Sequence, residues 1–331
     1  MTMRRRDFIT LLGSAAAAPS LWPLAARTQQ AALPVVGFLS NNSPATDANH
    51  LRAFHEGLRE AGYVEGDNVA ILYRWAEGHT DRLPALAADL VRRRVAVLAS
   101  FGTASGLAAK AATTTIPVVF AVSDDPVRLG LIASLAPPGS NATGHSFLTV
   151  ELTAKRLGLL RELEPRAAKV AVILDPALPQ TETQLRQLEA AAPAMGLKLQ
   201  ILKASTSAEI NDAFGALARE RPDALFVATG ALFESRRVQL VHLASRHAIP
   251  ASYSAREVVE VGGLMSYGPK LVESFRHVGA YTGRILKGDK PSDLPVVQPT
   301  KFEFVINAQT AGLIGIEVPV TLLARADEVI E

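Results

Sequence analysis

The feature that most constrains this chain is an alternation of short aliphatic runs with helical stretches, which begins at Pro34. Runs rich in Val, Ile and Leu are typical of buried strands, and the stretches between them space apolar residues three or four positions apart, as at Leu51, Phe54 and Leu58. Strands that alternate with helices predict right-handed crossovers and a parallel sheet covered on both faces. The first set predicts strands at Val35–Ser40, Asn68–Trp75, Val95–Ser100 and Ile116–Val122, and helices at Asp47–Ala61, Asp81–Arg93 and Thr103–Ala112.

The alternation restarts after Pro137-Pro138-Gly139-Ser140, the strongest loop signal in the chain. We therefore predict an α/β fold of two doubly wound parallel-sheet lobes, with lobe I at residues 31–147 and lobe II at 148–266. A return segment, 267–331, holds a helix at 270–286 that we expect on lobe I and a strand at 302–306 whose lobe the pattern does not decide. The remaining strands are expected at Thr143–Phe147, Lys169–Leu174, Leu197–Leu202, Ala224–Ala228, Pro250–Tyr253 and Leu264–Tyr267, and the helices at Glu151–Leu163, Thr181–Met195, Ser207–Arg219 and Leu232–His247.

Residues 1–28 have the layout of an export signal, a charged start followed by an alanine-rich apolar stretch. Arg5-Arg6 with Phe8 and Ile9 resembles the twin-arginine signal, whose pathway exports folded proteins. A membrane anchor or a first helix of the fold is the alternative, but one Gly and two Pro residues interrupt the stretch and argue against a spanning helix. We expect a periplasmic protein, with cleavage near Thr28 or Gln29, or a membrane tether if the leader stays.

Charge and cysteine content exclude several classes of protein. The chain of 331 residues is long enough for about two domains, with 48% hydrophobic and 20% charged residues, as in an ordinary globular protein. Its formal net charge is +2, and four Arg and one Asp give residues 1–28 a charge of +3, so the remainder carries −1. That remainder lacks the basic excess that nucleic-acid binding requires. The absence of cysteine excludes disulfides, thiolate catalysis and Cys-ligated metals.

Polar side chains gather where the predicted strands end. In open α/β sheets, ligands bind outside the carboxyl ends of the strands, so these loops predict a site between the lobes. Gly102 and Thr103 open a helix directly after a strand, an arrangement that suits a ligand carboxylate. The candidate ligand-binding residues are Ser40, Asn41, Phe101, Gly102, Thr103, Ser123, Asp124, Asp125, Asp175, Thr229, Tyr253 and Tyr267.

Each candidate also has a purely structural interpretation. Thr103 fits the cap of its own helix, and Asp124 and Asp125 before Pro126 fit a turn and a helix cap. Asp175 fits a cap of the helix at Thr181. Ser40 and Asn41 fit a closing turn. The aromatic residues Phe101, Tyr253 and Tyr267, with Trp75 beside them, fit the hydrophobic core.

Enzyme and cofactor signatures are absent from the sequence. There is no Gly-x-Ser-x-Gly elbow, no His-Glu-x-x-His motif and no Walker loop, and Gly102 to Gly106 has the wrong spacing for a dinucleotide fingerprint. The seven histidines are scattered, and His242 and His247 lie off one helical face. We predict no metal and no cofactor.

Several short motifs together resemble one family. They are the twin-arginine leader, Val36-Gly37-Phe38-Leu39, Tyr73-Arg74-Trp75-Ala76-Glu77-Gly78, Asp81-Arg82-Leu83-Pro84-Ala85-Leu86-Ala87, Asp125-Pro126-Val127, Asn141-Ala142-Thr143-Gly144, Ser266-Tyr267-Gly268 and Ala326-Asp327-Glu328-Val329-Ile330. The set resembles the bacterial ABC-transporter substrate-binding proteins of the tryptophan/tyrosine-uptake type along essentially the whole chain. The resemblance implies a type I periplasmic binding protein, in which two lobes joined by a hinge close on a ligand, and a permease partner. Some members bind aromatic amino acids, but ligand identity does not carry over.

We therefore expect a non-enzymatic, monomeric receptor that delivers an amino acid or related small carboxylate to an ABC permease. Its ligand's acid group is expected at Gly102 and Thr103, an amino group at Asp124 or Asp125, and apolar parts at the aromatic candidates. An exported α/β enzyme is the main alternative, because a fold alone does not fix function. A ligand-binding regulator core is a further alternative, and it would need a DNA-binding headpiece where this chain has its leader.

Overall fold

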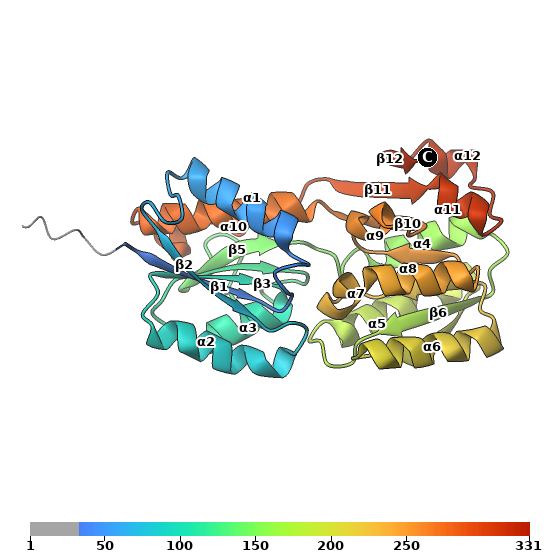
Figure 1. Ribbon diagram of the computed structural model, residues 1–331, viewed down its shortest axis with the longest axis horizontal. Coiled ribbons are helices and arrows are strands. Elements are labelled where there is room, and N and C mark those ends of the chain that lie inside the picture. Colours follow the sequence, from blue (N-terminus) through green and yellow to red (C-terminus); the bar gives the residue numbers. More distant parts are fainter. Residues whose placement is uncertain (1–32) are drawn as a thin grey trace, which may run out of the picture. The chain divides into compact units, whose positions relative to one another are not determined.

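The computed structural model describes residues Leu33–Glu331, and the predicted leader lies outside them. Two mainly parallel sheets with helices on both faces organise this part, which forms one compact unit (Figure 1). The prediction of two α/β lobes is confirmed. Among these residues no helix combines the length and apolar character needed to cross a bilayer.

Lobe I is built on a five-stranded parallel sheet in the order β2-β1-β3-β4-β5. Apolar side chains of α1 and α10 pack on one face of this sheet and those of α2 and α3 on the other. The bounds are β1 Val35–Ser40, α1 Ala48–Glu60, β2 Ala70–Trp75, α2 Leu83–Arg92, β3 Val97–Phe101, α3 Thr103–Ala112, β4 Val118–Val122, β5 Ala142–Ser146 and α10 Leu271–Leu286.

The helix α10 lies along α1 although the two are far apart in sequence (Figure 1). Glycines allow the two backbones to touch. A Cβ atom at Gly57 of α1 would lie 1.9 Å from the carbonyl oxygen of Arg276, and one at Gly279 of α10 would lie 2.1 Å from that of Phe54. Any side chain at either position would push the helices apart.

Lobe II is built on a seven-stranded sheet in the order β12-β11-β10-β9-β8-β6-β7. The strand expected at 302–306 is β11, and it pairs with β10, so it belongs to lobe II. Its antiparallel pairing differs from the all-parallel expectation. The bounds are α4 Thr153–Leu163, β6 Lys169–Leu174, α5 Thr181–Ala191, β7 Lys198–Lys203, α6 Ser207–Glu220, β8 Ala224–Val227, α7 Ala231–Ser235, α8 Arg237–Arg246, β9 Ala251–Tyr253, α9 Arg256–Glu260, β10 Met265–Pro269, β11 Phe302–Asn307, α11 Ala308–Leu313, α12 Val320–Leu323 and β12 Glu328–Ile330.

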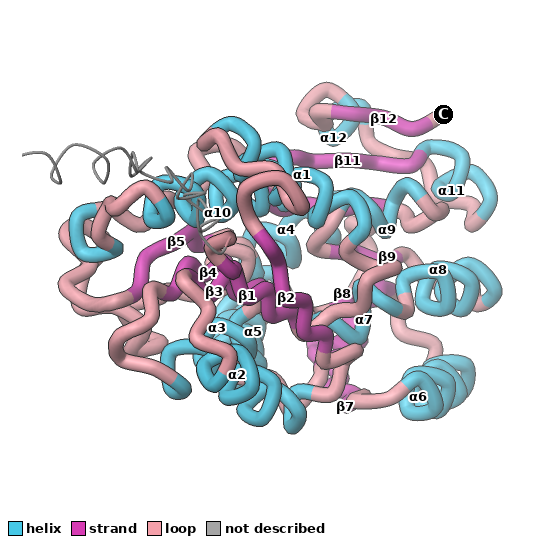
Figure 2. The backbone as a smooth tube through the Cα atoms, turned by 60° about the vertical axis from the view of Figure 1, so that its left-hand side comes forward, coloured by secondary structure: helices cyan, strands magenta, loops and turns pink. Residues whose placement is uncertain are grey.

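Two long helices expected from the sequence are interrupted. The one expected at Leu232–His247 is divided at Arg236 into α7 and α8, and the one expected to reach Met195 ends at Ala191. Pro193 explains the second break, because its ring removes a backbone donor and clashes with the preceding turn. The sequence also missed α9 and β12, and β12 lies beside β11 at the edge of the sheet (Figure 2).

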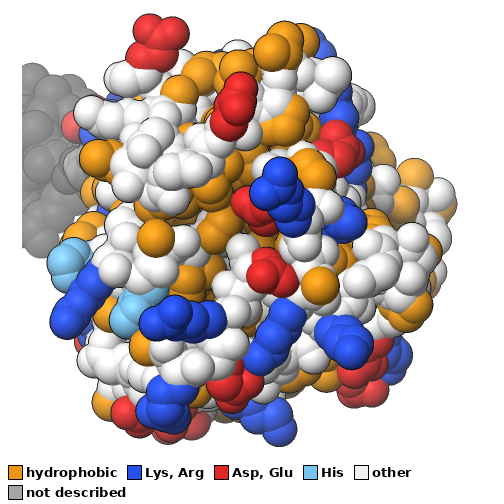
Figure 3. Space-filling view, turned by 90° about the vertical axis from the view of Figure 1, so that its right-hand side faces the viewer, with side chains coloured by type: hydrophobic (Ala, Val, Ile, Leu, Met, Phe, Trp, Pro, Cys, Tyr) orange, Lys and Arg blue, Asp and Glu red, His pale blue; other side chains and the backbone are white. Residues whose placement is uncertain are grey.

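The chain passes between the lobes through residues 147–152, at residue 270 and again through 287–301. Phe147 and Thr149 of the first passage line the pocket described below. On the face of lobe II turned to the viewer in Figure 3, acidic and basic side chains are interspersed, with apolar atoms between them. That face therefore carries no large patch of one charge sign.

Candidate functional site

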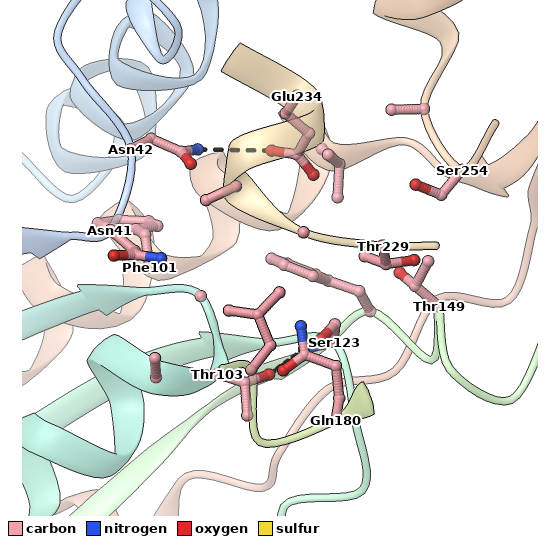
Figure 4. A pocket seen from close by; sticks show the side chains of 18 of the residues that line it. Asn41, Asn42, Phe101, Thr103, Ser123, Thr149, Gln180, Thr229, Glu234 and Ser254 are labelled. Carbon is pink, nitrogen blue, oxygen red and sulfur yellow. Dashed lines mark hydrogen bonds between the residues drawn. The ribbon is translucent and has the colours of Figure 1, made fainter. Parts of the chain in front are cut away.

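A pocket of about 70 Å³ lies between the lobes at the carboxyl ends of their strands (Figure 4). Loops after β1, β3 and β4 of lobe I face loops after β6, β8 and β9 of lobe II, and α10 contributes from the side. The wall combines hydroxyl, amide and carboxylate groups with aromatic rings. Its residues are Asn41, Asn42, His50, Phe101, Gly102, Thr103, Ala104, Ser123, Phe147, Thr149, Leu178, Gln180, Thr229, Gly230, Ala231, Glu234, Ser254, Ala255, Leu271 and Phe275.

The start of α3 opens into this pocket without a side-chain cap. Gly102 precedes the helix with φ 96°, a left-handed conformation that glycine adopts without strain. The Thr103 hydroxyl does not cap the helix; it accepts from the backbone N–H of Ser123 at 3.2 Å and lies 2.9 Å from the Ser123 hydroxyl. The structural interpretation of Thr103 as a cap is therefore wrong. First-turn N–H groups and two hydroxyls meet at one wall, which suits a carboxylate.

Three stacked rings form the aromatic wall. The centroids of Phe101 and Phe275 are 4.3 Å apart with 13° between the planes, and those of Phe275 and His50 are 4.5 Å apart with 20° between them. Phe147 adds a fourth aromatic ring to the pocket lining. A flat apolar group of a ligand would pack against this surface.

His50 connects the lobes. Its Nδ1 lies 3.3 Å from a carboxylate oxygen of Asp47, and its Nε2 lies 3.4 Å from a carboxylate oxygen of Glu257 on α9. Burial lowers the pKa of His50, but the hydrogen bonds to Asp47 and Glu257 outweigh burial and raise the pKa to about 10. His50 is therefore a cation at neutral pH, shared by one carboxylate from each lobe.

Glu234 on α7 is the carboxylate that lines the pocket. Its Oε2 accepts a hydrogen bond of 3.5 Å from the Asn42 amide of lobe I, drawn as a dashed line in Figure 4. Burial, with the nearby charges of Asp47 and Glu257, raises the pKa of Glu234 to about 7, although the charge of His50 acts in the opposite direction. Among the described residues Glu234 forms no ion pair within 4.0 Å.

Arg156 of α4 links two strands of lobe II whose following loops line the pocket. It is fully buried, and its guanidinium donates to the carbonyl oxygens of Val227 at the end of β8 and Ser252 in β9. Burial lowers the pKa of Arg156 to about 9. By joining two strand ends, Arg156 positions the loops that carry Thr229 and Ser254 into the pocket.

Six of the predicted residues line the pocket, namely Asn41, Phe101, Gly102, Thr103, Ser123 and Thr229. The predicted residues Asp124 and Asp125 do not line the pocket. Asp124 pairs with Arg128 and accepts from the backbone N–H of Asp125, while Asp125 accepts from that of Val127 at 2.9 Å. Both close a turn, and no helix follows Pro126.

Four other predicted residues also lie outside the pocket wall. Ser40 donates to Asp47 at 2.8 Å, and Asp175 accepts from Ser205 at 2.6 Å. Tyr253 is buried in the core of lobe II. Tyr267 packs against Phe302 and Phe304 of β11. These residues support the loops around the site, and the placement of a ligand's amino group at Asp124 or Asp125 is not supported by this geometry.

His50, Glu234 and Phe275 also line the pocket but lie within helices, so the pattern of polar residues at strand ends does not indicate them. Trp75 packs on Phe38 with centroids 4.9 Å apart, in agreement with its interpretation as a core residue. Within Leu33–Glu331, no cluster of three His, Asp or Glu side chains could hold a metal ion.

Two α/β lobes that enclose a pocket between the ends of their strands define a solute-binding protein of the type I periplasmic binding protein fold. The family model for ABC transporter substrate binding proteins matches residues 35–330, and the chain belongs to this family. Members of the family work outside the cytoplasmic membrane and pass a small solute to an ABC permease.

Individual relatives agree with this assignment. A tyrosine-binding protein of Clostridioides difficile is 29% identical over 260 residues, which cover 78% of this chain and 74% of the relative. A solved ABC domain from Streptococcus pneumoniae in complex with L-Trp is 25% identical with a TM-score of 0.81, covering 90% of this chain and 100% of that one. A ligand-free, open structure of a substrate-binding protein with adhesive properties from Clostridium difficile is also 25% identical, with a TM-score of 0.62 over 90% of this chain and 99% of that one.

Proposed function

We propose that this receptor captures an amino acid, or a closely related small carboxylate, and delivers it to its permease. The observation that carries the proposal is one pocket whose lining combines an uncapped helix start, a carboxylate and stacked aromatic rings. The names of the relatives, which refer to tyrosine and L-Trp, support the same class of ligand. The ligand's carboxylate is placed at Gly102, Thr103 and Ser123, and its apolar part at Phe101 and Phe275.

Hinge closure is the proposed mechanism. A ligand that contacts both lobes binds the closed arrangement better and shifts the population towards it. The described arrangement has the character of the closed state, since His50 reaches Glu257 and Asn42 reaches Glu234 across the lobes. At equal identity, its TM-score is 0.81 to the L-Trp complex and 0.62 to the ligand-free, open structure, which supports the same interpretation.

Mass spectrometry of the solute that copurifies with the protein tests the ligand class. We expect an amino acid or small carboxylate, recovered unchanged after long incubation because the protein is a receptor. A ligand without a carboxylate would contradict the proposed placement, and turnover of the solute would favour an enzyme.

Thr103→Val removes one hydroxyl from the carboxylate wall at nearly constant volume. We expect the dissociation constant for the copurified solute to rise about 5- to 30-fold, because the variant loses one or two hydrogen bonds. The exposed Thr114→Val is the matched control in lobe I and should bind as the wild type does. Calorimetry that finds the same affinity in Thr103→Val would refute the placement.

We also propose that the protein reaches the periplasm by the twin-arginine route and acts there as a monomer. Replacing Arg5 and Arg6 by Lys should keep the precursor in the cytoplasm, because that route reads the arginine pair itself and not positive charge alone. Fractionation of cells that express each form measures this. Unchanged export of the Lys variant would assign the leader to the general secretion route.

A further inference from the structure

Glu234 stands between two cavities. It lines the inner pocket and also a second cavity of about 270 Å³, which is bordered by the start of α1 and by α9. His50, Ala255 and Leu271 line both spaces as well. Glu234 therefore contacts the interior of the site and has a neighbouring space through which water and protons can exchange.

The charges around Glu234 do not balance. Asp47 and His50 face it from α1, and Glu257 faces it from α9. The one cation of this set, His50, is already shared by Asp47 and Glu257. Arg237 of α8 donates to the backbone carbonyl of Glu234 at 3.0 Å, not to its carboxylate. Three carboxylates and one cation leave the carboxylate of Glu234 without a positive partner in the described part of the chain.

The same pocket holds further acceptors that lack a donor. Asn41 and Gln180 both line the pocket. Their side-chain amide oxygens are buried and have no hydrogen-bond partner among the described residues. Asn41 is 6% exposed and Gln180 5% exposed. Buried polar atoms are normally satisfied, so we expect a solute in the pocket to offer N–H or O–H donors to these oxygens.

We propose that Glu234 is the acceptor for an ammonium group of the solute, and that this contact discriminates amino acids from carboxylates without an amine. The inference rests on the proposed function and names the group that the second lobe recognises. The ammonium supplies the missing cation to the carboxylate cluster, and it does so between Glu234 of lobe II and the asparagines of lobe I. Recognition of the amine and closure of the lobes thus use the same residue.

Binding should release protons near neutral pH. Burial between the lobes raises the pKa of Glu234 to about 7, so a substantial fraction of the closed protein carries a neutral Glu234 at pH 7. An ammonium favours the ionised carboxylate and lowers that pKa, so the proton leaves when the ligand binds. Affinity should fall as pH decreases from 8 to 6, by about tenfold, because only the ionised fraction is competent.

Calorimetry with L-tyrosine and L-tryptophan, and with their deaminated propionate analogues, tests the inference. Titrations at pH 7 in buffers of different ionisation enthalpy give the number of protons released. We expect release with the amino acids and none with the analogues. Glu234→Gln should weaken binding of the amino acids at pH 8 by about 10- to 100-fold, remove the proton release and leave the analogues unaffected.

Glu257→Gln is the matched control, since it removes the same charge from the same cluster but from a carboxylate that already has His50 as its partner. Burial, the largest cause of the raised pKa of Glu234, remains in this variant, so proton release should persist, reduced by the loss of the Glu257 charge, whatever happens to the affinity. The inference would be overturned if amino acids bound Glu234→Gln as tightly as the wild type, or if they bound the wild type without releasing protons. In either case the proposed function, a receptor for amino acids, would still stand. If neither these amino acids nor their analogues bind the wild type, and the copurified solute lacks a carboxylate, both proposals are wrong.

Discussion

Gly279→Ala should lower the free energy of unfolding by about 2 to 3 kcal/mol, the usual cost of forcing an extra group into a packed interface. Alanine is normally the better helix residue by about 1 kcal/mol, so the expected sign is opposite to that of helix propensity. The cause is steric, because the new Cβ atom would lie 2.1 Å from the carbonyl oxygen of Phe54 and 3.0 Å from the backbone nitrogen of Leu58. Neither backbone atom can rotate away. Denaturant unfolding followed by circular dichroism measures the difference.

The control is Gly215→Ala in α6, also a helical glycine but with nothing within 4 Å of the added Cβ. This variant should be more stable than the wild type by about 0.5 to 1 kcal/mol. Gly279→Ala with wild-type or higher stability would show that α1 and α10 can separate without cost.

Acidification should destabilise lobe I through the buried His145 of β5 and the partly buried His277 of α10. Burial, with the neighbouring His277, lowers the pKa of His145 to about 3, and burial, with the charge of Arg284, lowers that of His277 to about 4. Both are neutral in the folded protein, and in the unfolded chain they bind protons below about pH 6.5. Their contribution is present above that pH and is lost as the pH falls towards 4. We expect a loss of about 3 kcal/mol between pH 7 and 4.5, after allowance for partial solvent access.

The double variant His145→Gln, His277→Gln should lose less stability over this pH range than the wild type does. The slope of unfolding free energy against pH is the measurement, so a uniform destabilisation of the variant does not affect it. His79→Gln, at an exposed position, should keep the wild-type slope. An unchanged slope in the double variant would assign acid sensitivity to other groups.

Central strands such as β1, β4, β6 and β8 could be predicted because each is a nearly continuous aliphatic run, and burial on both faces demands that pattern. The pairing of β11 could not, because it depends on how the return segment approaches an edge of lobe II. A shift of one residue also matters at a strand end. Tyr253 is the last residue of β9 and lies in the core, whereas Ser254, the first residue of the loop that follows, reaches the pocket.

The polar residues at strand ends correctly predicted part of the pocket lining, but they did not indicate its charged residues, Glu234 and His50. Asp124 is neutralised by Arg128, a pairing that depends on the turn between them. Glu234 and His50 meet at the pocket only when the lobes face each other. Their roles depend on how two helices that are remote in sequence are placed relative to each other, and the local sequence pattern does not predict that placement.

The late position of α10 in the sequence affects how the newly made chain reaches its native state. Phe275, Val278 and Tyr281 of this helix cover the face of the lobe I sheet that also carries Phe101. A nascent chain therefore finishes the lobe that emerges first from the ribosome only after most of the second has been synthesised. Until then that apolar face is open to chaperones and to aggregation, as in incomplete domains generally. The sheet of lobe II is in turn incomplete until β11 and β12 have been synthesised, so the two lobes become complete at nearly the same point of synthesis.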